Sequence, residues 1–350
     1  MLDLNDKILS GERINKEEAI SLFKWDLLTL GYLANSIRQR MHTDPVVTYI
    51  VDRNINYTNI CISGCKFCAF WRKKGAKDAY LLSFQELSKK IEETIALGGI
   101  QILLQGGLHP DLKIEFYEDM LSYIKGHYPI IHIHGLSAPE IAHIAKNSGL
   151  SIEETILRLK TAGLDSIPGG GAEILVDKVR KEISPRKCDT STWLKVMEIA
   201  HKMGIKTTAT MMFGHIETYA DRVEHMLKIR ALQDKTHGFT AFIPWTFQPK
   251  NTALNHIRAV GAAEYLKTLA ISRIVLDNIP NIQASWVTQG PKIGQISLFF
   301  GANDMGSLMI EENVVAATGV SFRLKEEEMR YLIEDAGFRP QRRNMRYEWV

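Results

Sequence analysis

Residues 59–70 read Asn-Ile-Cys-Ile-Ser-Gly-Cys-Lys-Phe-Cys-Ala-Phe and place three of the chain's four cysteines, Cys61, Cys65 and Cys68, within eight positions. Three thiolates with this Cys-x3-Cys-x2-Cys spacing can hold three corners of a cubic 4Fe-4S cluster. The fourth iron then has no protein ligand, so it can bind and activate a small molecule instead of only transferring electrons. Gly64, between the first two cysteines, lets the backbone wrap closely around the metal.

Two other uses of the cysteines compete with an open cluster. A structural zinc site needs four ligands, and Cys188 or a histidine would have to supply the fourth. A disulfide framework is typical of short secreted chains with an even number of cysteines. The compact triplet favours the open cluster, and a non-catalytic iron–sulfur or zinc protein stays as the alternative from another functional class.

The composition is that of an ordinary folded enzyme. The 350 residues are 45% hydrophobic and 24% charged, with a net charge of +3, which argues against disorder and against a broad basic surface for nucleic acid. No segment is long and apolar enough to span a membrane, and residues 1–7 lack the pattern of a signal peptide. We therefore expect a cytoplasmic enzyme without nucleic-acid or membrane partners, in a reducing compartment where exposed thiolates survive.

Short apolar strands alternate with amphipathic helices along the chain. Several strands are apolar on both faces, as in a parallel sheet that is covered on both sides. About eight strand–helix units in a chain of this length predict an α/β fold of the (β/α)8 TIM-barrel type; an open doubly wound sheet is the alternative. The predicted strands are 46–51, 100–105, 130–135, 164–167, 205–213, 239–245, 282–287 and one near 299–302.

We divide the chain into residues 1–45, an N-terminal helical extension, and residues 46–350, the barrel domain with a C-terminal tail. Within the extension, residues 15–40 are predicted to be helical, with Asn15 at the N-terminal cap. Residues 326–337 predict a last helix, packed outside the barrel.

The cysteine spacing, with the aromatic Phe67 directly before the last cysteine, resembles the radical S-adenosylmethionine superfamily. In that family the open iron chelates the amino and carboxylate groups of S-adenosylmethionine, and the reduced cluster cleaves it to methionine and a 5'-deoxyadenosyl radical. The resemblance implies two cofactors, a 4Fe-4S cluster on Cys61, Cys65 and Cys68 and S-adenosylmethionine, with Phe67 near the adenine. Because barrel enzymes carry their chemistry in the loops after the strands, we expect the other site residues at strand ends.

Cofactor contacts are expected after the second and third strands. Gln105, Gly106 and Gly107 follow the second strand, and the resemblance implies that this glycine-rich segment receives the amino group of the methionine moiety. Ser137, after the third strand, is either a further cofactor contact or only the cap of the next helix.

The fourth and fifth strands extend the expected cofactor site. The resemblance implies that Glu173 contacts S-adenosylmethionine, and that Met212 and Glu217 border the adenine. A plain core strand would also contain methionines. Lys195, on the helix before the fifth strand, could face the methionine carboxylate, but a solvated lysine is the expected reading.

Substrate and catalytic residues are expected on the remaining strands. Trp245 and Gln248, at the end of the sixth strand, offer an apolar wall and an amide for a flat substrate. Asn303 and Asp304 are expected after the eighth strand, where Asn303 is a candidate substrate contact and Asp304 is the candidate general base. A turn explains both residues equally well. His134 either faces the barrel interior near the substrate or is a hydrogen-bonded core histidine.

Four longer stretches narrow the resemblance within the superfamily: 103–110, 242–249, 284–292 and 300–307. They are similar to the cyclic dehypoxanthine futalosine synthases of the futalosine route to menaquinone, and the similarity runs from about residue 18 to 338. It implies hydrogen abstraction from the ribose C4' of dehypoxanthine futalosine and ring closure onto its benzoate ring. Aminofutalosine synthases and deazaflavin (F420) precursor synthases share the cluster and glycine motifs and are the alternatives.

A basic turn follows the cluster motif directly. Arg72, Lys73 and Lys74 either dock an acidic electron donor of the flavodoxin or ferredoxin type or form a solvated turn.

Overall fold

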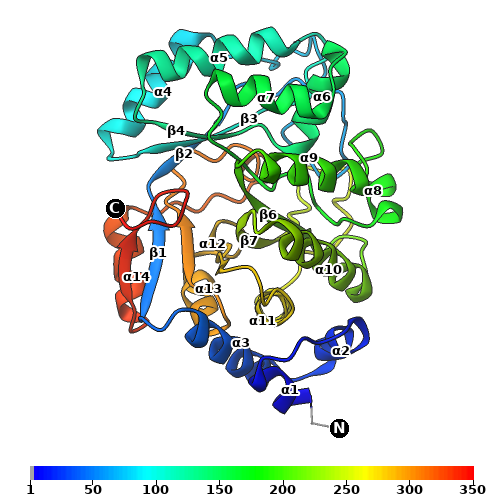
Figure 1. Cartoon of the computed structure of the whole chain (residues 1–350), viewed down its shortest axis with the longest axis vertical. Coiled ribbons are helices and arrows are strands. Elements are labelled where there is room, and N and C mark those ends of the chain that lie inside the picture. The colour runs from blue at the N-terminus through cyan, green and yellow to red at the C-terminus, as the bar shows by residue number, and fades with distance from the viewer. Residues whose placement is uncertain (1–3) are drawn as a thin grey trace.

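Parallel strands form the centre of the computed structural model, which describes residues 4–350 (Figure 1). Strands β2 to β8 lie side by side in chain order in one sheet, and β10, β1 and β9 form a second, in that order. Every pairing between named strands is parallel. The strands are β1 (Val46–Ile50), β2 (Asp52–Asn56), β3 (Gln101–Gln105), β4 (His132–Gly135), β5 (Ser166–Ile167), β6 (Lys206–Phe213), β7 (Phe239–Thr246), β8 (Asn281–Ile282), β9 (Asp304–Ser307) and β10 (Arg339–Arg342).

Two links join these sheets into a barrel. β1 and β2 are halves of one run of chain, separated only by Val51. A parallel bridge between Gln283 and Asp304 connects the end of β8 to β9, and β9 pairs with β1. The strand order therefore closes on itself, which confirms the predicted α/β barrel type; a doubly wound sheet would keep two open edges.

Helices cover the outside of the strands (Figure 1). They are α1 (Leu4–Ser10), α2 (Lys16–Ser21), α3 (Leu27–Met41), α4 (Phe84–Ala96), α5 (Ile114–His127), α6 (Ala138–Ser148), α7 (Ile152–Ala162), α8 (Asp177–Ile183), α9 (Thr190–Lys202), α10 (Tyr219–Thr236), α11 (Ala262–Val275), α12 (Trp286–Gln289), α13 (Pro291–Ile296) and α14 (Glu326–Asp335). The last helix, α14, lies outside the barrel as predicted.

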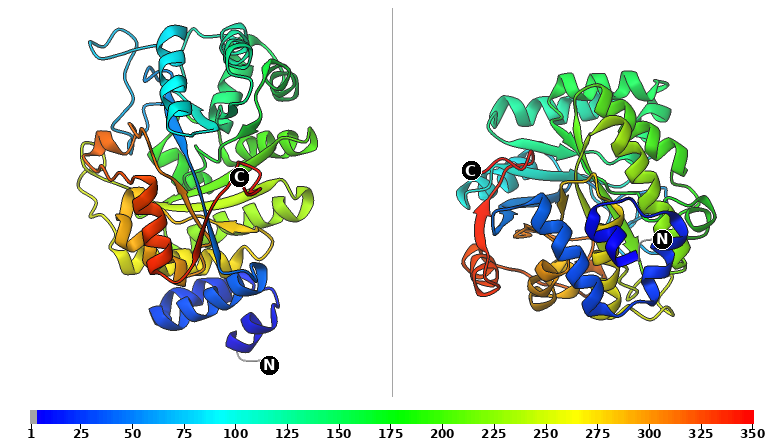
Figure 2. Two further views of the ribbon diagram at one scale, coloured as in Figure 1. Left: turned by 90° about the vertical axis from the view of Figure 1, so that its left-hand side faces the viewer. Right: turned by 60° about the horizontal axis from the view of Figure 1, so that its bottom comes forward.

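The helices α1, α2 and α3 lie together at one end of the molecule (Figure 2). The capping box of Asn15 opens α2 as predicted. Most of the range predicted to be helical, 15–40, is helical, but it is divided into two helices, because a 3-10 turn follows Ser21 and Asp26 caps a new helix by accepting from the backbone N–H of Thr29 at 2.9 Å. A second cap within the run ends one helix and starts another. α3 packs against α11 and leads into β1.

Three strand predictions are corrected by the structure. The first strand does not stop at Val51, because β2 continues it to Asn56; four of the five β2 residues are polar, so a search for apolar runs did not detect this strand. The strand expected over 282–287 ends at Ile282, and α12 begins at Trp286. The strand expected near 299–302 is a 3-10 turn, and β9 starts only at Asp304, since a short apolar run does not distinguish a strand from a buried turn.

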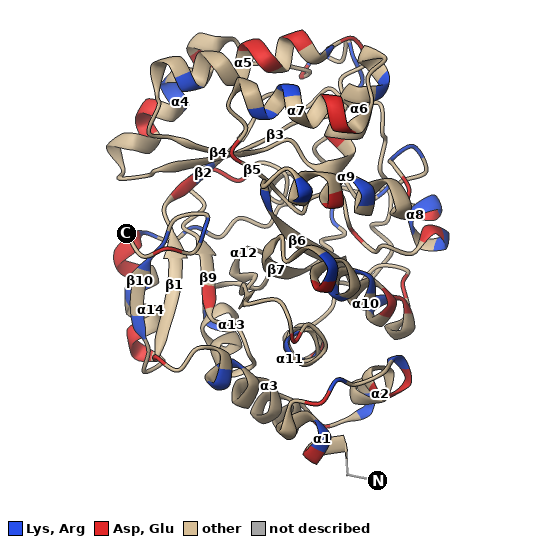
Figure 3. Ribbon diagram, viewed as in Figure 1, with Lys and Arg blue, Asp and Glu red and all other residues tan. Residues whose placement is uncertain are grey.

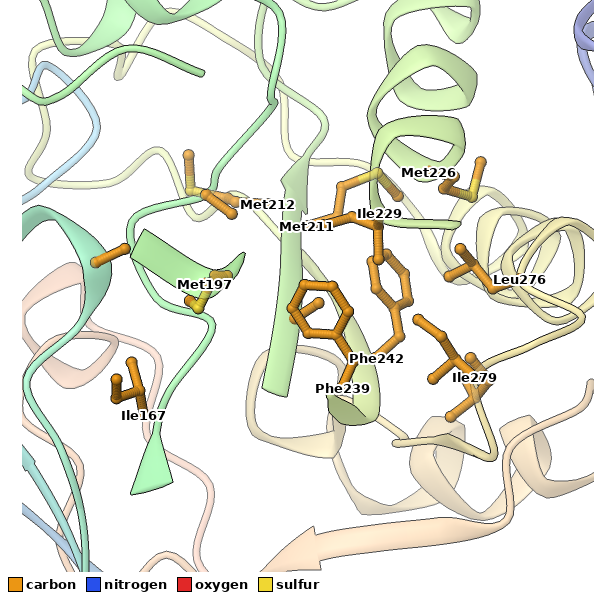
Figure 4. Packing of buried hydrophobic residues seen from close by; sticks show 14 of the residues in the cluster. Ile167, Met197, Met211, Met212, Met226, Ile229, Phe239, Phe242, Leu276 and Ile279 are labelled. Atoms are coloured by element: carbon orange, nitrogen blue, oxygen red, sulfur yellow. The ribbon is translucent and has the colours of Figure 1, made fainter. Parts of the chain in front are cut away.

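The core fills the space between the sheet and its outer helices. Figure 4 shows Met211 and Met212 of β6 and Phe239 and Phe242 of β7 packed among side chains from α9 and α10. These four residues are at most 2% exposed. The core therefore fixes β6 and β7, the two longest strands, whose carboxyl ends border the site described next.

Candidate active site

The three cysteines lie in a loop after β2 that backbone hydrogen bonds hold on several sides. The N–H of Cys61 donates to the carbonyl of Arg72 at 2.9 Å, that of Ile62 to Leu108 at 3.0 Å, and that of Lys66 to Ile183 at 2.8 Å. Leu108 follows β3 and Ile183 ends α8. The loop is therefore anchored at the carboxyl ends of the barrel strands.

The surroundings of the sulfurs hold the metal-free thiols in their neutral form. Burial raises the pKa of Cys65 to about 11 and also raises that of Cys68, while Lys187 opposes the shift at both thiols. The hydroxyl of Ser63 lies 3.0 Å from Cys65 Sγ. Without a cation the two thiols stay protonated, so iron binding has to displace their protons.

A cavity of about 220 Å³ opens over the cysteine loop. The three cysteines line it together with six predicted cofactor residues: Phe67, Gln105, Gly106, Gly107, Ser137 and Glu173. The structure thus brings together residues from four separate segments that the sequence placed at strand ends. We call it the cofactor cavity.

The glycine segment approaches the cysteine loop so closely that side chains are excluded. A Cβ on Gly107 would lie 2.2 Å from the carbonyl oxygen of Ile60 and 2.9 Å from the Cβ of Cys61, and one on Gly106 would lie 2.4 Å from the ring of Tyr57. Glycine is therefore required where the backbone forms the cavity wall. This backbone cradle fits a ligand held over the cluster.

Glu173 forms a buried ion pair with Lys187, a cofactor-cavity residue that sequence reasoning missed. Although burial acts against ionisation, Lys187 and then Arg180 hold the pKa of the Glu173 carboxyl below its usual value. Glu173 has a left-handed backbone with φ of 40°, which is rare outside glycine and typical of functional positions. The Lys187 ammonium also lies 5.1 Å from the centre of the Phe67 ring.

Ser137 caps α6 and at the same time lines the cofactor cavity. Its hydroxyl donates to Glu140 at 2.6 Å, and Glu140 also accepts from the N–H of Gly106 at 2.9 Å and from the hydroxyl of Tyr57 at 2.8 Å. Glu140 therefore ties the glycine segment to α6.

A second cavity, of about 270 Å³, occupies the barrel interior, and we call it the lumen cavity. His134 and Trp245 line it as expected for substrate residues. Four residues line both cavities: Gln105, Gly170, Trp245 and Val314. The two cavities therefore adjoin, and a group bound in one lies next to a group bound in the other.

The lumen histidine is held neutral. His134 Nδ1 lies 2.7 Å from Ser166 Oγ, and His132 Nε2 lies 2.7 Å from the same oxygen. Burial lowers the pKa of His134 well below its usual value, and the pKa of His132 to about 4. The lowered pKa keeps this imidazole neutral at physiological pH and makes it a weaker base than a free histidine.

Sequence reasoning missed four polar residues that line the lumen cavity: Asp52, Asn54, Gln101 and Glu312. Asp52, Asn54 and Glu312 lie outside the apolar runs that marked strands, whereas Gln101 lies within a predicted strand but carried no signal of its own. Gln101 Nε2 donates to Asp52 at 2.7 Å, and Asn54 Nδ2 donates to Glu312 at 2.8 Å. Burial raises the pKa of both carboxyl groups.

Met212 and Glu217 lie beside the cofactor cavity without lining it. Met212 is 1% exposed in the core, and its N–H donates to the carbonyl of Glu173 at 3.0 Å. Glu217 accepts from the N–H of Gly214 at 2.7 Å and pairs with Arg222 at 2.8 Å. Met212 therefore supports the Glu173 backbone and Glu217 supports the turn after β6, and adenine contact stays a prediction.

Because β9 starts later than the predicted eighth strand, Asp304 is its first residue and Asn303 directly precedes it. Neither residue lines the cofactor cavity. Asn303 Oδ1 accepts from Arg273 at 2.8 Å and its amide donates to Asn281 at 2.8 Å. Asp304 pairs through both oxygens with Arg343, which lines the lumen cavity. Gln248 donates to its neighbour Thr246 at 3.0 Å, in the loop after β7.

The basic turn is largely neutralised by acidic partners. Arg72 pairs with Asp78 at 2.6 Å, and Lys74 pairs with Asp111. Lys195 is exposed on α9, as expected for a solvated lysine. Figure 3 shows basic and acidic residues interspersed on helices such as α8 and α10, and docking of an acidic electron donor stays a prediction.

Cys188 does not line the cofactor cavity, and its contacts differ from those of the other three cysteines. It packs against the hydrophobic core, and its carbonyl accepts from Arg180 Nη2 at 2.6 Å. Within residues 4–350 no three His, Cys, Asp or Glu side chains converge closely enough to hold a single metal ion; the cysteines of a cubic cluster bind separate irons. The donor set and the cavity above it fit a cluster held by Cys61, Cys65 and Cys68.

Two family models match the chain. Residues 55–229 match the radical SAM superfamily, and residues 236–350 match the CofH/MqnC C-terminal region. A cyclic dehypoxanthine futalosine synthase of Halalkalibacterium halodurans is 44% identical over 99% of this chain and 94% of the relative. One of Streptomyces coelicolor is 45% identical over 98% of this chain and 87% of the relative.

A differently named relative is equally similar in sequence. The 5-amino-6-(D-ribitylamino)uracil–L-tyrosine 4-hydroxyphenyl transferase of Methanococcoides burtonii is 44% identical over 96% of this chain and 95% of the relative.

Solved structures share the fold at low identity. Methylornithine synthase PylB is 18% identical, with a TM-score of 0.70 over 97% of both chains. The FeFe-hydrogenase maturase HydG of Carboxydothermus hydrogenoformans is 19% identical, with a TM-score of 0.72 over 98% of this chain and 79% of that one. Among the helices described for residues 4–350, none combines the length and apolar character of a membrane span.

Proposed function

The chain belongs to the radical S-adenosylmethionine superfamily, an enzyme family that uses a 4Fe-4S cluster and S-adenosylmethionine, and from this premise we propose that it cyclises dehypoxanthine futalosine. The product is cyclic dehypoxanthine futalosine, a precursor of menaquinone. The full-length similarity to two bacterial enzymes of that name supports this choice of substrate.

The adjoining cavities are the observation that carries the proposal. The cysteine loop and the glycine cradle border one cavity, the barrel interior holds the other, and Trp245 and Gln105 stand at their junction. A radical made over the cluster therefore meets a substrate in the lumen without crossing solvent. Exclusion of competing hydrogen donors is what a protein supplies to radical chemistry.

When bound, the two cofactors supply a 5'-deoxyadenosyl radical that takes the hydrogen from ribose C4'. The chain holds the sugar carbon and the benzoate ring within near-attack distance, roughly 3–3.5 Å. Trp245 forms the flat wall against the ring, and neutral His134 takes up the proton that the ring loses after closure. The electron lost with that proton would pass to a one-electron acceptor, such as the oxidised 4Fe-4S cluster that Cys61, Cys65 and Cys68 would hold. Arg343 and Thr48 already donate hydrogen bonds to the Asp304 carboxylate. Asp304 therefore acts on this site indirectly, by positioning Arg343.

The cofactor roles follow the same geometry. Cys61, Cys65 and Cys68 hold the cluster, and the backbone of Gly106 and Gly107 leaves room for the methionine end of S-adenosylmethionine. We assign Glu173 and Ser137 to the same cofactor because their side chains line its cavity.

Product analysis tests the substrate assignment. The anaerobically reconstituted enzyme is incubated with reductant, S-adenosylmethionine and dehypoxanthine futalosine, and the products are analysed by mass spectrometry. We expect free 5'-deoxyadenosine and an organic product lighter than the substrate by two hydrogens. An adenosyl group within the main product would instead identify an aminofutalosine synthase type of reaction.

A second candidate function rests on the equally similar archaeal relative. The corresponding reaction joins 5-amino-6-(D-ribitylamino)uracil to the hydroxyphenyl part of tyrosine. Incubation with this pair of substrates separates the two candidates, since the cyclase needs a single substrate and the transferase needs both.

A further inference from the structure

Glu312 stands in the segment that spans the junction of the two cavities. It lines the lumen cavity, and Val314, two residues later, lines both cavities. Its neighbour Glu311 points the other way, with Arg53 at 2.6 Å and Lys90 at 2.8 Å. The outward pairs of Glu311 thus anchor the segment and direct Glu312 into the barrel.

Glu312 keeps acceptor capacity after its own hydrogen bonds are made. One carboxylate oxygen accepts from Asn54 Nδ2 at 2.8 Å, and the other accepts from the N–H of Val315 at 2.8 Å. Each carboxylate oxygen can accept two hydrogen bonds, so each has one position left. Glu312 remains partly accessible although it lies deep in the molecule, and this accessible surface borders the lumen cavity.

Asn54 adds a second sign that a donor is missing here. The residue is 5% exposed and lines the lumen cavity, and its carbonyl oxygen Oδ1 has no hydrogen-bond partner in the described part of the chain. The amide cannot be turned over, because its NH2 group has to face the Glu312 carboxylate. A buried acceptor without a partner costs stability until a donor reaches it.

We propose that Asn54 and Glu312 form the subsite that binds the vicinal hydroxyl groups of a ribosyl or ribityl substrate. A carboxylate with one free position on each oxygen matches two adjacent hydroxyl donors, as carboxylates do with ribose elsewhere. The pair stands beside the residues that line both cavities, so it holds the sugar carbons next to the cofactor. This inference deepens the proposed function and rests on it for the identity of the sugar.

The orientation of the substrate follows from the kinds of side chain that line the lumen cavity. Asp52 and Asn54 of β2 and Glu312 line it with hydrogen-bonding groups, whereas Trp245 and Trp286 line it with aromatic faces. We place the hydroxyl groups of the sugar toward β2 and the benzoate ring against the two tryptophans.

Binding without turnover tests the subsite. The reconstituted enzyme, with S-adenosylmethionine but without reductant, is titrated calorimetrically with dehypoxanthine futalosine and with its 2-deoxyribosyl and 3-deoxyribosyl analogues. We expect loss of a bound hydroxyl to weaken affinity roughly tenfold or more. Glu312→Gln should weaken binding of the full substrate by a similar factor and should largely abolish the preference over the deoxy analogues.

Glu311→Gln is the matched control, because it makes the same change one residue away on the outward side. It should lower thermal stability but keep the preference for the full substrate. Wild-type binding of both deoxy analogues as tightly as the substrate would overturn the subsite, and this arm needs no variant to fold. An unchanged preference in Glu312→Gln would also overturn it.

The same titrations separate this inference from the substrate assignment. Hydroxyl-dependent binding of 5-amino-6-(D-ribitylamino)uracil, without binding of the futalosine compound, would keep the subsite and refute the proposed function. Binding of neither compound would refute both.

Discussion

Lys187 and Glu173 show at the residue scale how the cofactor cavity controls charge. The Lys187 side chain is 15% exposed and that of Glu173 is 4% exposed, and each is the other's ion-pair partner. The cation lies close enough to the cysteine thiols to oppose the rise of their pKa. The pair therefore places a positive charge beside the thiolates without leaving that charge uncompensated.

Replacing Glu173 by glutamine tests this pairing. Glu173→Gln leaves the Lys187 ammonium buried without an anion, which should lower the free energy of unfolding by about 3–5 kcal/mol. Chemical denaturation of wild type and variant measures the difference. Glu182→Gln is the control, since its pair with Lys66 is exposed on both sides and should contribute under about 1 kcal/mol. Equal losses in the two variants would contradict the account.

The glycine segment after β3 and the cysteine loop act at the element scale as one unit. Their backbones touch at Gly107, where a Cβ would lie 2.2 Å from the Ile60 carbonyl. Gly107→Ala should therefore displace the cysteine loop, cost about 1–3 kcal/mol and lower the iron content of the reconstituted enzyme. Gly126→Ala, in α5 with open space around the added Cβ, should keep full iron content. Full iron loading of Gly107→Ala would refute this coupling.

His201 links α9 to its neighbours and gives them a pH dependence. Its ring nitrogens lie 2.7 Å from Thr236 Oγ1 and 2.8 Å from Thr207 Oγ1, and burial lowers its pKa to about 4. Below the ordinary value of 6.5 the unfolded chain binds a proton that the folded chain does not. Stability is then lost as the pH falls from 6.5 toward 4.

The pH dependence of His201 is measurable by substitution. Between about pH 7 and pH 5 this group should cost about 2 kcal/mol of folding free energy. His201→Gln should remove that part of the decline, as judged by urea unfolding at both pH values. Parallel pH curves for wild type and variant would contradict the assignment.

Element boundaries also decide how far the sequence could predict the site. The cysteine loop, the glycine segment and Glu173 carry local signals, and the structure gathers them in one cavity. Asn54 and Asp52 gave no such signal, because polar residues that face a barrel interior resemble a loop. Asn303 and Asp304 were placed at the wrong end of β9, because the buried turn before it reads as a strand. Glu312 lies far along the chain from Asn54, and Lys187 lies far from the cysteine loop, so only the fold brings them close.

On the scale of the whole molecule, the barrel holds two cavities in series. The cofactor cavity lies at the carboxyl ends of the strands and the lumen cavity lies beneath it, with four residues shared between them. The C-terminal tail supplies Arg343, Met345 and Tyr347 to the lumen lining. β10 pairs with β1 and leads into this tail, so residues after β10 help to form the lumen cavity. Composition and strand periodicity predicted the barrel, but not this use of its tail.

Transfer of hydrogen from the sugar to the cofactor tests the central claim most directly. Dehypoxanthine futalosine carrying deuterium at ribose C4' is incubated anaerobically with the enzyme, S-adenosylmethionine and reductant, and the 5'-deoxyadenosine formed is analysed by mass spectrometry. The account predicts 5'-deoxyadenosine that carries one deuterium, in step with the cyclic product. Unlabelled 5'-deoxyadenosine beside a cyclic product that keeps its deuterium, or no 5'-deoxyadenosine at all, would contradict it.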